Sequence, residues 1–198
     1  MHGLINRAIE MFFRQTYGSR RWALLTKTLN LEVSEFETML SYDDEATETL
    51  LAGLAASLDK NRTDILEDIG TFLVSHPSAE ALRRLLRFSG HDFVDFLHSL
   101  DDLPARARLA VPDLALPQIE LRAHNLEHFS ITLRDPKPGP IAFGHVLIGL
   151  LRALADDYGA LALLDHKGGR EGTEVIAVHL LQNVFAEGRE FALGAVAP

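Results

Sequence analysis

The hydrophobic period changes along the chain, and this limits the possible folds more than any other feature. In the first hundred residues apolar side chains recur every three or four positions, for example in 4–13 and 93–100, which is typical of amphipathic helices. From about residue 118 apolar and polar residues alternate, in 118–124 and again in 129–134, which is typical of half-buried strands. Helices followed by paired strands predict an α+β fold with a segregated antiparallel sheet.

The same patterns place the expected elements along the chain. They predict helices over 4–17, 22–29, 50–58, 65–73, 82–88, 93–100 and 146–154. They predict one hairpin over 118–134 with its turn at 125–127, and a second over 160–181 with its turn at 167–172. The run from Pro136 to Pro140 is interpreted as a stiff turn rather than a linker, because folded signals resume directly after it.

The size and composition are those of one soluble domain. The chain has 198 residues, of which 47% are hydrophobic and 24% charged, so it can bury a core without covalent staples. We expect a single domain over 1–198, divided into a helical lobe at about 1–75, an α/β lobe at about 76–185 and a tail at 186–198. No leader sequence and no long apolar stretch stand out, so a cytoplasmic protein without a membrane segment is expected.

Several functional classes are disfavoured by the composition. There is no cysteine, which excludes disulfides, thiolate-ligated haem and cysteine nucleophiles. The formal charge of −9 disfavours nucleic-acid binding, since phosphate backbones would be repelled. No nucleophile elbow, phosphate-binding loop or dinucleotide fingerprint is present. Acidic pairs such as Asp43-Asp44 and Asp101-Asp102 are interpreted as helix caps, so we do not expect an enzyme.

A series of short motifs resembles one known family. The motifs are Met1-x-Gly3-x-Ile5, Tyr17-Gly18 with Trp22, Tyr42 to Glu45, Asp92 to Asp101, Val111 to Pro117, and Gly149 to Ala153. Their order and spacing, from Met1 to about Leu181, resemble H-NOX (haem-NO/oxygen-binding) domains, and specifically the stand-alone, bacterial type of member. The resemblance implies a helical lobe and an α/β lobe with haem between them, and a role in sensory signal transduction.

The iron ligand of that family has no counterpart at the matching position. The family holds iron through the histidine of a Leu-Asp-x-x-His run, and the similar run here is Leu100-Asp101-Asp102-Leu103-Pro104. Pro117 lies thirteen residues further on, where the family has its next proline, which supports this register. Proline has no lone pair for iron, yet it is tolerated in the first turn of a helix. The resemblance therefore implies a helix that has kept its shape and lost its ligand.

The motif that grips the haem propionates is altered as well. The family's Tyr-x-Ser-x-Arg resembles Leu133-Arg134-Asp135-Pro136-Lys137 here. Asp135 would repel the propionates, and Lys137 cannot make the bidentate contact of an arginine. From Pro104 and this motif we expect no cofactor, with haem as the alternative.

The distal side of the family's pocket corresponds to apolar residues. The resemblance assigns Ile5, Val146 and Leu150 to it, with Val146 in place of the hydroxyl that stabilises oxygen in some members. These residues are equally well explained as core positions. Without haem, larger side chains or another apolar ligand would have to fill the volume.

Two of the nine histidines are the least remote substitutes for the missing ligand. His98 lies six residues before Pro104, and His145 begins the helix expected on the distal side. Each is more simply explained as a structural or surface histidine. No sequence spacing of histidines and acids indicates zinc or non-haem iron.

The function predicted from these observations is that of a haem-independent sensory protein on an H-NOX-like scaffold. It would act by contact with a separate effector enzyme, a histidine kinase or a cyclic-dinucleotide enzyme, and its input could be an apolar small molecule. The alternative is a haem-based NO/O2 sensor whose axial ligand is His98 or His145.

Overall fold

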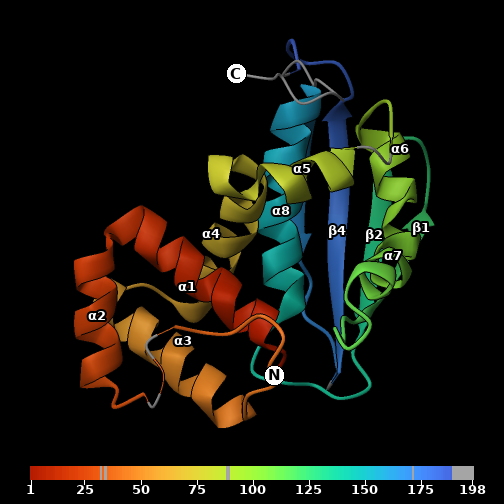
Figure 1. Cartoon of the computed structure of the whole chain (residues 1–198). Coiled ribbons are helices and arrows are strands. Elements are labelled where there is room, and N and C mark those ends of the chain that lie inside the picture. Colours follow the sequence, from red (N-terminus) through yellow and green to blue (C-terminus); the bar gives the residue numbers. More distant parts are fainter. Residues whose placement is uncertain (32, 34, 88–89, 171, 189–198) are drawn as a thin grey trace.

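The computed structural model describes residues 1–31, 33, 35–87, 90–170 and 172–188. Its helices are α1 (Gly3–Tyr17), α2 (Ser19–Thr28), α3 (Asp44–Leu58), α4 (Arg62–Ser75), α5 (Glu80–Arg87), α6 (Phe93–His98), α7 (Leu103–Ala110) and α8 (Phe143–Tyr158), with the short 3-10 helices η1 (Pro77–Ala79) and η2 (Leu100–Asp102). Its strands are β1 (Gln118–Ala123), β2 (His128–Arg134), β3 (Leu161–His166) and β4 (Thr173–Gln182). The predicted α+β class is confirmed (Figure 1).

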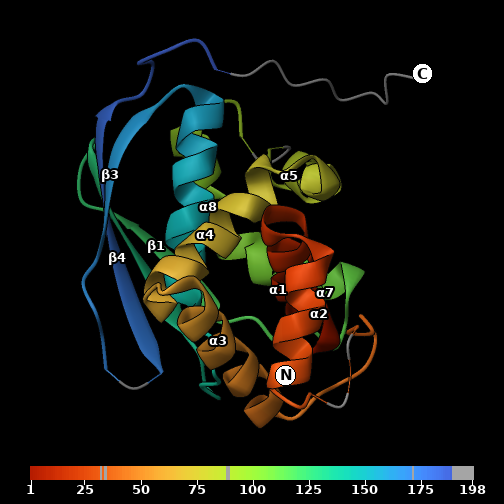
Figure 2. The ribbon, with the colours of Figure 1, turned by 90° about the vertical axis from the view of Figure 1, so that its left-hand side faces the viewer.

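The strands form one antiparallel sheet of four, in the order β1-β2-β4-β3. Both predicted hairpins are present, and they join through β2 and β4, where His128 pairs with His179. Phe129, Ile131 and Leu133 of β2 are buried, as the alternation in the sequence predicts. The helices lie on one side of the sheet (Figure 2), so its other face carries the more exposed residues.

Local signals in the sequence explain where several helices begin and end. α6 begins after Asp92, whose carboxylate accepts a hydrogen bond of 2.8 Å from the backbone N–H of Asp95, as an N-cap does. α8 ends at Tyr158, and the following Gly159 adopts a left-handed conformation with φ of 72° that glycine tolerates without steric cost.

Buried side chains form two hydrophobic clusters. One is built mainly from α1 to α4 and includes Phe13 and Leu50, which are both fully buried. The other packs α5 to α8 against the sheet and includes Phe96 and Ile131, also fully buried. The boundaries of the expected lobes stay a prediction, and residues 189–198 of the expected tail lie outside the described residues.

Helices α4 and α8 connect the two clusters, and they lie side by side (Figures 1 and 2). A Cβ atom on Gly70 of α4 would lie 2.0 Å from the carbonyl oxygen of Val146, and one on Gly149 of α8 would lie 1.9 Å from that of Glu67. The backbones of the two helices are therefore in direct contact, which only residues without a side chain allow.

Some elements differ from the expected ranges. α3 begins at Asp44, six residues earlier than the apolar spacing indicates, because a polar first turn carries no hydrophobic signal. α7 was expected only from the resemblance, since its Leu-Pro-Ala-Arg-Ala-Arg-Leu-Ala sequence has a weak apolar stripe. Among the described residues, no helix is both long and apolar enough to cross a membrane.

Candidate functional site

Pro104, which the resemblance assigns to the iron ligand, is buried near the start of α7. Proline occupies the first turn of this helix, as predicted, where its missing N–H leaves no hydrogen bond unmade. Its carbonyl oxygen accepts a hydrogen bond of 3.4 Å from Arg108. Pro117 is buried directly before β1.

The acids before Pro104 do not cap the helix with their side chains. Asp102 makes no side-chain capping bond to α7, contrary to the expectation from the sequence. Asp101 instead accepts a hydrogen bond of 2.7 Å from the backbone N–H of Leu121 in β1. Asp101 thus ties the turn before α7 to the sheet.

The residues that resemble the propionate motif differ in their exposure to solvent. Leu133 is buried in the core, Asp135 is half-buried and Lys137 is exposed. The Asp135 carboxylate accepts a hydrogen bond of 2.9 Å from the backbone N–H of Lys137, so it stabilises its own turn. These three residues therefore do not form a single positively charged site that could bind the haem propionates.

The three distal positions lie where the two hydrophobic clusters meet. Ile5 of α1 and Val146 of α8 are half-buried and pack against the first cluster. Leu150, one turn after Val146, is buried in the second cluster. The interpretation as core and the interpretation as pocket lining both agree with this placement.

His98 is the last residue of α6 and is exposed. Its ring meets Phe129 of β2 edge-on, with the ring centroids 6.2 Å apart. An exposed imidazole at a helix end gives haem little apolar contact.

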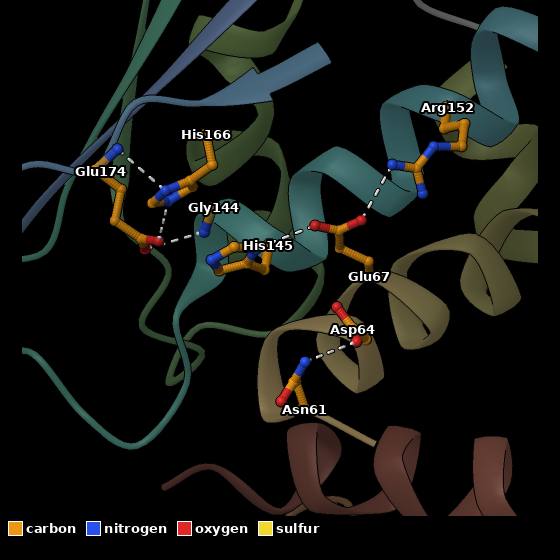
Figure 3. Close-up of polar contacts among 9 residues, drawn as sticks. Asn61, Asp64, Glu67, Gly144, His145, Arg152, His166 and Glu174 are labelled. Atoms are coloured by element: carbon orange, nitrogen blue, oxygen red, sulfur yellow. Dashed lines mark hydrogen bonds and ion pairs between the residues drawn. The ribbon is translucent and has the colours of Figure 1, made fainter. Parts of the chain in front are cut away.

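His145 lies in a cluster of paired histidines and carboxylates (Figure 3). Its Nδ1 is 3.2 Å from a carboxylate oxygen of Glu67, whose other oxygen accepts a hydrogen bond of 3.0 Å from Arg152. Its ring stacks on that of His166, with centroids 4.2 Å apart and an interplanar angle of 15°. We refer to Glu67, His145, His166 and Glu174 as the His-Glu cluster.

The other half of the His-Glu cluster holds the start of α8 against the sheet. The backbone N–H of Gly168 donates to Nδ1 of His166 at 3.1 Å, and Nε2 of His166 lies 2.9 Å from Glu174. Glu174 also accepts a hydrogen bond of 3.0 Å from the backbone N–H of Gly144. A carboxylate at the N-terminus of a helix is favoured by the helix dipole.

The protonation of the two rings follows from these partners. Nδ1 of His166 accepts a hydrogen bond, so in the neutral ring Nε2 carries the proton and donates it to Glu174. Nδ1 of His145 faces a carboxylate and donates to it, which leaves the lone pair on Nε2. An imidazole oriented by a carboxylate in this way is the usual arrangement of a metal-binding histidine.

Sequence reasoning did not identify most of this cluster. Glu67, His166 and Glu174 come from α4, β3 and β4, and they are distant from His145 along the chain. Gly144 is a sequence feature that relates to the cluster. A residue without a side chain is needed there, because a Cβ atom on Gly144 would lie 2.5 Å from a Glu174 oxygen.

A sequence comparison decides the family. The model of the Haem-NO-binding family (HNOB) matches residues 2–162 of the chain. The chain belongs to the haem-NO-binding family. The match includes α1 to α8 and both strands of the first hairpin, which confirms the resemblance inferred from the motifs.

Individual proteins agree with this family membership. Soluble guanylate cyclases 89Db and 89Da of Drosophila melanogaster are 23% identical over 161 residues and 21% identical over 163 residues, covering 81% and 82% of this chain. The chain matches only 24% of the length of each of these relatives.

Solved structures share the fold. An H-NOX protein from S. oneidensis in the Fe(II)NO ligation state has a TM-score of 0.75 and 16% identity, covering 92% of this chain and 100% of its own. An Fe(II) unliganded point mutant of an H-NOX protein from K. algicida has a TM-score of 0.74 and 18% identity, covering 93% of this chain and 99% of its own.

These findings overturn the expectation that this member of the family has no cofactor. The family is described as haem-NO-binding, and the S. oneidensis protein has been solved with Fe(II) and with Fe(II)NO. Both observations point to haem. The inference from Pro104 and Asp135 was wrong because the loss of one ligand position says nothing about donors that the fold brings from elsewhere.

The described residues fit haem iron only in part. Pro104 offers iron no lone pair, and Asp135 is turned towards the backbone of Lys137. Nε2 of His145 is a donor of the right kind, with the carboxylate of Glu67 behind it.

Proposed function

We propose that this chain is the haem-based gas-sensing module of a signalling system. The observation that carries the proposal is the match of the haem-NO-binding family over residues 2–162. The shared H-NOX fold supports it. The chain itself performs no catalysis in this account; haem supplies the iron that binds the gas, and the protein supplies its orientation and its surroundings.

The iron ligand that we assign is His145 rather than His98. His145 is half-buried, and its Nδ1 faces Glu67 at 3.2 Å. A ligand histidine gains basicity and a fixed orientation from such a carboxylate. His98 is exposed, and its ring lies edge-on to Phe129. It is therefore less buried than His145, and the contact given for its ring is with an aromatic side chain and not with a carboxylate.

Nitric oxide is the input that the family description supports, since the matching family is described as haem-NO-binding. A ligand at His145 lies on the same helix as Val146 and Leu150, so the gas would bind on the opposite side of the haem, towards α7. We therefore assign NO as the input from the family description and not from the residues of the distal side.

The output requires an effector enzyme. The matching relatives are guanylate cyclases, and the chain corresponds to 24% of their length. We infer that the gas signal changes the activity of such a cyclase, or of a histidine kinase or a cyclic-dinucleotide enzyme. To do so, NO must favour one conformation of the module over another.

Ligand addition to the reduced, haem-loaded chain tests this function. Reduced protein should shift its absorption spectrum when NO is added at one equivalent per haem, and should keep its unliganded spectrum in air for long enough to be recorded. A spectrum that changes with oxygen and not with NO would contradict the assignment. The His98→Ala variant serves as the matched control, since it removes an exposed histidine.

A further inference from the structure

A second group of possible metal ligands lies at the opposite end of β2 and β4 from Glu174. Glu127 directly precedes β2, His128 begins it, and His179 lies opposite His128 on β4. One ligand atom from each side chain lies within 4.8 Å of the others. From this geometry we propose that Glu127, His128 and His179 bind a divalent transition-metal ion, with Zn²⁺ as the best fit.

Strand pairing and turn hydrogen bonds hold the backbone around these residues in place without a metal. β2 and β4 are the two central strands of the sheet. The backbone N–H of Leu180 donates to the carbonyl oxygen of Glu127 at 2.7 Å, which holds Glu127 beside His179. Asn125 tightens the turn, since its side-chain oxygen accepts from the backbone N–H groups of Glu127 at 2.9 Å and His128 at 2.8 Å.

The same Asn125 oxygen also orients a ligand. It lies 3.1 Å from Nδ1 of His128, and an amide oxygen can only accept, so this nitrogen carries the proton. The lone pair of His128 is then on Nε2, the atom left for a metal. A hydrogen bond to the second ring nitrogen is the usual companion of a metal-bound histidine.

The two imidazoles are already parallel and close. Their centroids are 4.2 Å apart, with an interplanar angle of 17°. Two ligands on one tetrahedral Zn²⁺ lie about 3.3 Å apart, given bond lengths of about 2.0–2.1 Å. The lone pair of an imidazole lies in its ring plane, so both rings must rotate out of this stacked arrangement to bind one ion. The ligand atoms of the three side chains already lie within 4.8 Å of one another, so side-chain rotation is enough and the backbone need not move.

The donor set favours zinc over the harder cations. Two imidazoles and one carboxylate are typical of zinc sites that keep an open fourth position, whereas Mg²⁺ and Ca²⁺ prefer oxygen ligands alone. Glu127 and His128 are exposed and His179 is half-buried, so an ion can reach the site from solvent. The formal charge of the chain, −9, favours cations in general.

Bound metal would connect the two hairpins of the sheet. Glu127 is the last residue of the turn in the first hairpin, His128 follows it, and His179 belongs to the second hairpin. Binding to the folded state alone raises thermal stability by mass action. The bound ion is thus expected to stabilise the pairing of β2 with β4, independently of haem.

A calorimetric titration of the chelator-treated full chain with ZnCl2 tests the proposal. One Zn²⁺ should bind per chain, and His179→Ala and His128→Ala should each weaken binding at least tenfold. His91→Ala, an exposed histidine outside the site, is the matched control and should bind as the parent chain does. Circular dichroism establishes that each variant is folded.

Thermal melting gives a second measurement. Zn²⁺ should raise the melting temperature of the parent chain and of His91→Ala, and should leave that of the His128→Ala/His179→Ala double variant unchanged. Undiminished Zn²⁺ binding by the double variant, or binding lost instead in His145→Ala, would overturn the proposal. Neither outcome depends on haem, whose absorption is recorded separately.

Discussion

Gly70 of α4 lies directly against the carbonyl group of Val146 in α8, so close that a Cβ atom on Gly70 would be 2.0 Å from the Val146 oxygen. Gly149 makes the reciprocal approach to Glu67. These glycines bring the two helices into backbone contact at the point where the two hydrophobic clusters meet. The same contact places Glu67 of α4 next to His145 of α8.

Substitution of Gly70 by alanine is expected to destabilise the protein by about 3 kcal/mol, at the upper end of ordinary overpacking effects. In a helix interior the same change normally stabilises by about 1 kcal/mol, so a loss would identify the close contact. Chemical denaturation measures the difference. Gly139→Ala is the control, because its added Cβ would meet the flexible end of Met1 at 3.3 Å; equal effects in both variants would refute the packing argument.

Replacement of Pro104 by histidine is expected to strengthen haem binding on the order of tenfold, since it supplies an imidazole at the position that the resemblance assigns to the family's iron ligand. The cost to α7 should stay below about 1 kcal/mol, because histidine is an ordinary helix residue. Haem titration followed by absorption measures the affinity. Pro104→Ala controls for the loss of proline, and unchanged affinity in Pro104→His would show that the register of the resemblance is wrong.

Removal of the His145 imidazole should reduce haem affinity by about tenfold or more and should shift the position of the main haem absorption band. Glu67→Gln should weaken binding less and also change the spectrum, because it alters the partner that orients the ring. His98→Ala should leave both properties unchanged. If His98→Ala abolishes binding while His145→Ala does not, the ligand assignment is incorrect.

Asp92 should make the start of α6 sensitive to acid. Hydrogen bonding from the backbone of Asp95 holds the pKa of this carboxyl below its ordinary value, with a further contribution from Asn183. Because the folded-state pKa is the lower one, the carboxylate stabilises the fold above the ordinary range of aspartate, and this contribution disappears as the pH falls through the folded pKa.

Asp92→Ala should therefore lower stability by about 1 kcal/mol at neutral pH, and the difference from the parent chain should shrink in acid. Asp92→Asn retains an acceptor that does not titrate, so it should preserve most of the neutral-pH stability. Denaturation curves recorded across the pH range distinguish the variants. A deficit of the alanine variant that is constant with pH would exclude the carboxylate as the cause.

Much of the fold could be predicted because its signals are local. Apolar spacing identified the helices around 4–17 and 93–100, and alternation identified both hairpins. The joining of the hairpins through β2 and β4 could not be predicted, since strand order depends on packing between distant segments. α7 left a weak signal because few of its residues are buried.

The candidate site was less predictable than the fold. The motifs identified the family and the unusual Pro104, but they led to the incorrect inference that haem is absent. His145 was singled out, whereas its partners Glu67 and His166 were not, because they lie on other elements far away in sequence. The proposed zinc ligands Glu127 and His128 are adjacent, but only the β2–β4 register adds His179.

The measurement that tests the central claim most directly is the absorption spectrum of the full chain, purified from haem-sufficient cells and then titrated with haem. We expect a sharp Soret band that saturates at one haem per chain and moves when NO is added to the reduced protein. A colourless chain that takes up no added haem under the same conditions would contradict it.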